Sequence, residues 1–457
     1  MSRNHNGRFY QLFIACIDLA LLHVGFLIAY WLHDGFVPES SVNVSLYLLS
    51  AAGLLSFYLF DLYSDFKRKK AQHLVYLVVI SLLAYSFVLL CAGFWGGSFP
   101  MLQEHSLIFK AFVLQSVLLV SFRLCIWYLI RLYSGRKNVL IVGKNENESL
   151  QLAIKFLNHD RGWFTLIGFL PVAQRSQLEK DLANVHAVLL GPGVSKEATD
   201  EIVSLCTENG KEILIVPEMY ELFISTANTQ QIDDMLVFSI EPPKLSRSSE
   251  MAKRLFDVLV SGIILVMTSP IFLLFYFLIP ATSKGPAFYK QERLGLHGKA
   301  YQIYKFRSMK QDAEKLTGPT LAADHDPRIT KIGHLLRATR MDELPQIINV
   351  LKGEMSIVGP RPEREFFIRQ FSKQVPNYFH RLSVKPGITG LAQVMANYTT
   401  TVEDKLRYDL MYVRNLSFTM DLKILLQTIR VVLQRDQAQG VKEVEAQQPM
   451  RSMGSDS

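Results

Sequence analysis

The sequence predicts three structural parts: a bundle of four transmembrane helices, an α/β domain with a parallel sheet, and an α+β domain that carries a re-entrant membrane helix. Three observations predict this order. Long apolar runs concentrate in the first 130 residues, short apolar strands alternate with helical segments from 137 to 216, and one further apolar run covers 255–279. We place the boundaries at 1–134, 135–248 and 249–436, with a disordered tail at 437–457, where the composition is polar.

Four apolar segments, at about 11–32, 44–63, 72–95 and 107–130, are each long enough to cross about 30 Å of hydrocarbon as a helix. Cations precede the first segment, separate the second from the third and follow the fourth: Arg3, Arg8, the run 67–70, Arg131, Arg136 and Lys137. The other two loops have no Lys or Arg before Lys110. Because Lys and Arg are enriched in cytoplasmic loops, we predict both ends of the bundle in the cytoplasm.

Asp18 and Arg123 lie within these apolar segments. A charge inside a membrane helix is a candidate functional residue by default. Arg123, however, is near enough to the cytoplasmic end to extend its cation to the interface, and Asp18 can pair within the bundle. We favour a structural role for both residues.

The middle domain is predicted to hold strands at 138–143, 165–170, 186–190 and 212–216, with helices at 149–158 and 196–209. A dinucleotide site after Gly143 would need further glycines at fixed offsets, so that the backbone can approach a pyrophosphate. The loop instead continues Lys-Asn-Glu-Asn-Glu, whose acids would repel a diphosphate. We therefore expect a structural or regulatory domain, with a homodimer contact as one such role.

The fifth apolar run, 255–279, contains a single charge, Asp257. A crossing would place unequal positive charge on its two sides, but Lys and Arg flank both sides about equally. Pro270 removes one helical hydrogen bond, and the hydroxyl of Ser269 can satisfy the freed carbonyl. We predict a broken re-entrant helix that enters and leaves the same leaflet, with a plain fifth span as the alternative.

The stretch 341–363, MDELPQIINVLKGEMSIVGPRPE, contains the candidate site. Asp342 and Glu343 open an amphipathic helical run, and Pro360 and Pro362 stiffen the backbone around Arg361. Paired acids at a helix start are usually a cap, and an arginine between prolines is usually a surface turn. Together they suit a site for phosphate and a metal ion.

More cations surround this stretch. Strand-like alternation over 301–309 puts Lys305 and Arg307 on one face, where two cations can meet one phosphate. The segment 324–342 adds Arg328, Lys331, Arg337 and Arg340, and such a concentration suits diphosphate recognition. The net charge of +8 accompanies membrane segments, so it favours phospholipid headgroups and phosphorylated substrates over nucleic acid. Four unpaired cysteines indicate neither a zinc site nor a disulfide framework.

Residues 251–435 resemble the bacterial sugar transferases, a family of monotopic polyprenyl-phosphate phosphosugar transferases. The resemblance rests on the Asp342-Glu343 stretch, the segment Lys-Phe-Arg-Ser-Met at 305–309, the turn at 385–393, and Lys253, Arg254, Asp257, Ser269 and Pro270. The middle domain resembles, more weakly, the Rossmann-like modules in the larger members of the family.

This resemblance implies an enzyme of the bacterial inner membrane, with its soluble domains in the cytoplasm. It would transfer sugar 1-phosphate from a UDP-sugar to undecaprenyl phosphate, releasing UMP, as the priming step of exopolysaccharide, O-antigen or capsule synthesis. It further implies Asp342 as the nucleophile and Glu343 as a ligand of Mg²⁺. From their charge and placement we expect Lys305, Arg307, Arg328 and Arg361 to contact the phosphates. The alternatives are a glycosyltransferase that transfers the sugar without its phosphate, and a non-catalytic scaffold for polymer export or assembly.

Overall fold

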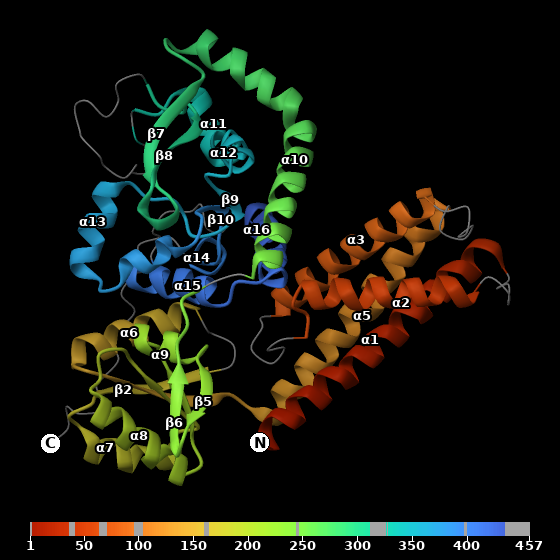
Figure 1. Ribbon diagram of the computed structural model, residues 1–457. Coiled ribbons are helices and arrows are strands. Elements are labelled where there is room, and N and C mark those ends of the chain that lie inside the picture. Colours follow the sequence, from red (N-terminus) through yellow and green to blue (C-terminus); the bar gives the residue numbers. More distant parts are fainter. Residues whose placement is uncertain are drawn as a thin grey trace. The chain divides into compact units, whose positions relative to one another are not determined.

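A computed structural model describes residues 2–35, 42–63, 71–95, 104–159, 164–243, 246–310, 326, 328–396 and 400–434 (Figure 1). The predicted disordered tail and the cationic run 67–70 lie outside these residues. Contacts divide the chain into two compact units, one up to Val216 and the other from Pro217 onward. Each unit is described by itself.

The four predicted apolar segments are all helical: α1 (Ser2–Asp34), α2 (Val42–Leu59), α3 (Ala71–Trp95) and α5 (His105–Ser134). Their buried faces meet around Leu22, Phe57, Leu82 and Leu119, while many other large apolar side chains point outward. Among the described residues, α1, α3, α5 and the later helix α10 are long and apolar enough to cross a membrane, and α2 is shorter. These helices make the chain a membrane protein.

Asp18 and Arg123 form a buried ion pair between α1 and α5, with exposed side-chain fractions of 0% and 1%. Arg123 also donates to the carbonyl of Leu62 and lies over the ring of Tyr63. Arg123 is therefore directed into the bundle, and its charge is compensated there by Asp18.

The parallel sheet predicted for the middle domain is present. Its order is β2-β1-β3-β4, formed by β1 (Lys137–Gly143), β2 (Phe164–Pro171), β3 (Ala187–Leu190) and β4 (Glu212–Ile215). The helices α6 (Glu146–His159), α7 (Arg175–Asp181) and α8 (Lys196–Glu208) connect the strands. Central strands β1 and β3 are almost entirely buried, which explains their continuous apolar sequence.

The second unit begins with α9 (Met219–Ile224) and an antiparallel hairpin, β5 (Asn228–Ile232) with β6 (Met235–Ser239). These elements lie before the predicted boundary at 248, yet they contact the C-terminal domain. Met219 and Leu222 pack beside Leu410 of α15 (Val402–Arg414), and Arg414 of that helix donates to Thr226.

The long helix α10 (Arg247–Thr282) contacts the C-terminal domain through both of its ends. Near its start, Arg254 donates to the carbonyls of Val350 and Leu351, and the buried carboxylate of Asp257 accepts from Ser356 and from the amide of Ile357. Towards its end, Phe275 and Ile279 join a buried cluster with Phe306 and Leu336. Between these contacts its apolar side chains are exposed: Leu259, Ile263, Val266, Met267 and Leu274.

Helix α10 bends along its length (Figure 1). Pro270 lies inside it, and a proline removes the hydrogen bond to the carbonyl four residues earlier, here that of Val266. The hydroxyl of Ser269 donates to this same carbonyl at 2.8 Å. The predicted break is therefore wrong: the helix bends but continues through Pro270, because the freed acceptor is satisfied.

The C-terminal domain combines small sheets with helices. β7 (Phe288–Leu294) pairs antiparallel with β8 (Ala300–Phe306), and β9 (Ser356–Val358) pairs parallel with β10 (Gly387–Thr389). Gly359 and Gly387 let two backbone segments meet, because a Cβ on Gly387 would lie 2.1 Å from the amide nitrogen of Gly359. The remaining helices are α11 (Lys331–Ala338), α12 (Gln346–Lys352), α13 (Glu365–Gln374), α14 (Leu391–Met395) and α16 (Phe418–Gln434).

Candidate active site

Asp342 and Glu343 lie on a 3₁₀ turn, Met341–Glu343, between α11 and α12. The sequence placed them at the start of the helix itself, but Pro345 caps α12 and the acids precede it. Met341 and Leu344 flank the pair and pack in the cluster that includes Phe275 and Ile279 of α10. The two acids are therefore anchored directly on the apolar helix.

The residue before this turn, Arg340, has a left-handed backbone conformation with φ 55° and ψ 17°. A non-glycine residue in this region carries strain that the surrounding structure must hold, and such strain concentrates at functional sites. The hydrogen bond from the Glu343 amide to the Arg340 carbonyl fixes the turn.

Glu343 is held by two cations. Its Oε1 accepts from Lys305 Nζ at 3.0 Å and from Arg361 Nη2 at 2.9 Å, and its side chain is 14% exposed. Burial alone would raise the pKa of Glu343, but the charges and hydrogen bonds of Arg361 and Lys305 outweigh it and hold that pKa well below its usual range. The structure thus brings together three of the residues that the sequence singled out.

Asp342 has the opposite electrostatic environment. Burial raises the pKa of its carboxyl, and the adjacent Glu343 charge adds to this, while Lys305, Arg337 and Arg361 offset part of the effect. No described residue donates a hydrogen bond to its carboxylate. Asp342 is therefore a desolvated carboxylate beside cations, without the hydrogen bonds that would make it a weak nucleophile.

Arg337 is the cation that sequence reasoning did not separate from its neighbours. Its Nε donates to Ser308 Oγ at 2.9 Å, and its charge acts on Asp342. The signal available in the sequence was its place on α11, which leads directly into the turn with the two acids.

The other two predicted phosphate contacts have different partners. Arg307 is 6% exposed and donates to the carbonyls of Lys284 and Ser283 at 2.7 Å and 2.8 Å, at the end of α10. Arg328 donates from Nε and Nη2 to the carboxylate of Asp326, and these hydrogen bonds lower the pKa of Asp326 to about 2. Neither guanidinium has a hydrogen bond to Asp342 or Glu343 in the described structure.

The donor set fits Mg²⁺ only in part. The described residues contain no group of three or more His, Cys, Asp or Glu that could hold a metal ion. Both cation contacts of Glu343 use Oε1, so its second oxygen has no hydrogen bond within the described residues. Magnesium in phosphoryl-transfer sites is commonly held by one or two carboxylates together with substrate phosphates, and Glu343 can supply one such oxygen.

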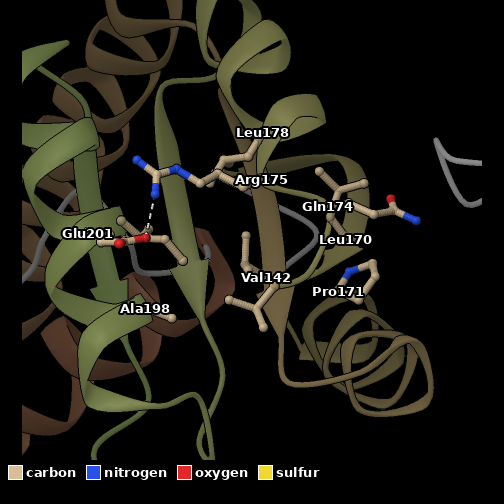
Figure 2. Close-up of a pocket in the computed structure, with 10 residues that line it drawn as sticks. Val142, Leu170, Pro171, Gln174, Arg175, Leu178, Ala198 and Glu201 are labelled. Atoms are coloured by element: carbon tan, nitrogen blue, oxygen red, sulfur yellow. Dashed lines mark hydrogen bonds and ion pairs between the residues drawn. The ribbon is translucent and has the colours of Figure 1, made fainter.

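The middle domain offers a cavity of about 30 Å³ between α7 and α8 (Figure 2). Its lining is mostly apolar, and Arg175 pairs with Glu201 across it at 2.5 Å. That volume holds about two water molecules. Gly143 serves packing, because a Cβ there would lie 2.6 Å from Ser149 Oγ, and the side chain of Asn145 caps the following helix. These contacts favour a structural role for the loop after β1.

Residues 248–435 match the family described as bacterial sugar transferase. The chain is 38% identical over 239 residues to a UDP-glucose:undecaprenyl-phosphate glucose-1-phosphate transferase of Klebsiella pneumoniae, covering 51% of each chain. It is 33% identical to an undecaprenyl-phosphate galactose phosphotransferase of Salmonella typhimurium, over 60% of each chain.

A longer match is to a UDP-galactose-lipid carrier transferase of Erwinia amylovora, which is 30% identical over 361 residues, 71% of this chain and 74% of that protein. The aligned parts thus span about half to three quarters of these relatives. By the extent and identity of these matches, the chain belongs to the bacterial sugar transferase family.

Proposed function

We propose that the protein transfers sugar 1-phosphate from a UDP-sugar to undecaprenyl phosphate and releases UMP, as the first step in building a surface polysaccharide. The proposal rests on the different surroundings of the two neighbouring acids. Glu343 accepts hydrogen bonds from Lys305 and Arg361, while the Asp342 carboxylate has no hydrogen bond within the described residues. The relatives' names suggest the substrates, since they describe transferases that act on UDP-sugars, undecaprenyl phosphate, or both.

In the first step, a carboxylate oxygen of Asp342 attacks the phosphorus bonded to the sugar. The bond from this phosphorus to the bridging oxygen breaks, and the electron pair leaves with UMP. In the second step, an oxygen of the lipid phosphate attacks the same phosphorus and breaks its bond to Asp342. The products are the lipid diphosphate sugar and the original carboxylate.

The cations around the pair suit this chemistry, because phosphoryl transfer depends mainly on positioning and charge neutralisation. Arg361 is 45% exposed on its side chain, so part of its guanidinium remains open to a diphosphate. Lys305 and Arg337 act on Asp342 from other elements, β8 and α11. When bound, Mg²⁺ would neutralise charge on the donor phosphates, held by the free oxygen of Glu343.

We further propose that α10 is re-entrant and places the site at the inner surface of the membrane. Supporting this, both ends of α10 contact one compact domain, whereas the apolar middle is exposed. A straight crossing would separate those ends by the bilayer. The distribution of Lys and Arg among the loops supports a bacterial inner-membrane protein in which both ends of the four-helix bundle face the cytoplasm.

The topology is tested by single cysteines in a variant without the four native cysteines. In sealed cells, an impermeant thiol reagent should label Asp34→Cys, in a predicted external loop, and not Lys290→Cys, after α10. Labelling of Lys290→Cys from outside would contradict the re-entrant placement.

Mass photometry of the protein in nanodiscs tests the predicted homodimer.

The reaction is tested with a UDP-sugar that carries a radiolabel in the sugar. Without lipid, the wild-type protein should retain label and release UMP, and Asp342→Asn should do neither. Adding undecaprenyl phosphate should move the label to the lipid. Release of UDP in place of UMP would indicate transfer of the sugar without its phosphate, and turnover by Asp342→Asn would exclude the covalent step.

A further inference from the structure

The loop that carries Arg361 is fixed through its main chain. Its residues 361–364 belong to no helix or strand, and Pro360 and Pro362 contribute no amide hydrogen. Nevertheless, four successive carbonyls each accept a hydrogen bond from a distant segment. The donors to the carbonyls of residues 360, 361, 362 and 363 are, in order, Gly387 N at 3.0 Å, Arg381 Nη2 at 2.9 Å, Arg293 Nη1 at 3.5 Å and Leu294 N at 3.2 Å.

Arg381 makes the shortest of these four bonds. It lies on a 3₁₀ segment, Tyr378–Ser383, and is 5% exposed. Its Nε donates to Asp409 Oδ2 at 2.9 Å, and its Nη1 donates to the hydroxyl of Tyr378 at 3.0 Å. One planar guanidinium thus joins the Arg361 main chain to Asp409 on α15 and to Tyr378.

Stability alone does not account for this ion pair. Asp409 is buried like Arg381, with a side chain 4% exposed. Taking both charges out of water costs about as much as their attraction returns, so an apolar pair of similar volume is often as stable. An apolar pair, however, has no donor for the carbonyl of Arg361. What the ion pair adds is a fixed, directional contact to that loop.

We propose that Arg381 and Asp409 act as a brace that positions Arg361. Asp409 orients the guanidinium of Arg381, and Arg381 holds the main-chain carbonyl of Arg361. The side chain of Arg361 is thereby directed to Glu343 and the donor phosphates. Both are positioning residues, since within the described structure neither has a hydrogen bond to Asp342 or Glu343. The brace depends on the proposed function only for its effect on turnover, because its effect on the loop is independent of any substrate.

The first experiment is a double-mutant cycle on UMP release by the full chain in nanodiscs. Arg381→Lys keeps the charge beside Asp409 but lacks the planar fork that also reaches the Arg361 carbonyl. We expect it to lower kcat/KM about tenfold, in keeping with the cost of a small misplacement of a positioned group. In an Arg361→Lys background the same change should cost less than about twofold, because the group it positions is already altered.

Two further variants separate positioning from folding. Arg381→Met with Asp409→Leu removes the brace without leaving a buried charge, and it should stay folded with a similar loss of turnover. Tyr378→Phe is the matched control, since it removes a buried hydrogen bond to the same guanidinium without touching the loop. It should leave kcat/KM unchanged.

Hydrogen–deuterium exchange of the peptide 355–364 gives a readout without substrate. Exchange should be faster in Arg381→Lys and in the double apolar variant, and unchanged in Tyr378→Phe. Unaltered exchange in the first two, or an equal loss of kcat/KM in both Arg361 backgrounds, would overturn the brace. If no UDP-sugar supports UMP release by the wild-type protein, the proposed function is wrong. The hydrogen–deuterium exchange result would still show whether Arg381 and Asp409 fix the loop, because that measurement needs no substrate.

Discussion

Asp342 and Glu343 are neighbours in the chain, yet their surroundings shift the pKa of the two carboxyls in opposite directions. Glu343 accepts two charge-assisted hydrogen bonds, and the pKa of its carboxyl is held low. Asp342 is desolvated beside the Glu343 charge, and the pKa of its carboxyl is raised. The ionised form of Asp342 is therefore costly to the fold and available for reaction.

Replacing Asp342 with Asn should raise the thermal stability of the protein at neutral pH while it abolishes turnover. A carboxyl whose folded pKa lies above its unfolded pKa destabilises the fold at pH values above that folded pKa. The gain should disappear as the pH falls through the raised pKa of Asp342, because the protonated acid is then neutral like the amide. Melting temperatures of both proteins with chelator and without donor measure this. A lower melting temperature for Asp342→Asn at pH 7 would contradict it.

Replacing Glu343 with Gln should have the opposite effect on stability. A lowered folded pKa contributes stability above the ordinary carboxyl pKa, and this contribution is lost as the pH falls through the folded value. The substitution leaves Lys305 and Arg361 facing a neutral amide. Because Arg361 is 45% exposed and solvent screens part of the attraction, we expect a loss of about 1–2 kcal/mol at pH 7. Chemical denaturation at pH 7 in low and in high salt checks it, because salt screens the attraction to the half-exposed Arg361, and equal losses in both would argue against the ion-pair origin.

Replacing Arg307 with Gln should lower the melting temperature and leave the KM for the UDP-sugar within about twofold. Its guanidinium donates to the carbonyls of Ser283 and Lys284, so its loss unpairs the end of α10. If Arg307 instead contacts a phosphate of the substrate, as the sequence predicted, Arg307→Gln should raise the KM and leave the melting temperature unchanged. Arg328→Gln, at the other predicted phosphate contact, is the matched comparison.

Replacing either Asp18 or Arg123 with an uncharged residue should destabilise the membrane bundle by about 3–5 kcal/mol, since it leaves the other charge buried alone. Asp18→Leu combined with Arg123→Met should recover most of this loss. Melting temperatures in detergent, with Arg131→Ala as the control on the same helix, give the comparison. If each single variant were as stable as the double variant, the remaining charge would have to be in contact with water, and the buried ion pair would not explain the stability of the bundle.

The sequence predicted the elements whose pattern is local. Strand β3 and residues 139–143 of β1 are apolar because both of their faces are buried, and the helices of the bundle follow from length and composition. The hairpin β5–β6 was missed because β5 is exposed along its whole length and shows no alternation. The burial and the partners of a side chain depend on its tertiary neighbours. Strand-like alternation in the sequence could therefore put Lys305 and Arg307 on one face, but it could not show that Lys305 pairs with Glu343 while Arg307 donates to main-chain carbonyls. For the same reason Asp409 on α15 gave no signal of its contact with Arg381.

Ser269 should matter to α10 only while Pro270 is present. Its hydroxyl donates to the carbonyl of Val266, the acceptor that Pro270 leaves without a helical partner. In the native background Ser269→Ala therefore unpairs a carbonyl on the exposed apolar part of the helix, and we expect a loss of about 1 kcal/mol. In a Pro270→Ala background residue 270 supplies its own amide hydrogen, so the loss should vanish. Thr268→Ala is the control, because Thr268 donates to the carbonyl of Ile264, which keeps its helical partner. The melting temperatures of the wild-type chain, the two single variants and the double variant in detergent give a double-mutant cycle. An equal effect of Ser269→Ala with and without Pro270 would show that the hydroxyl does not compensate for the proline.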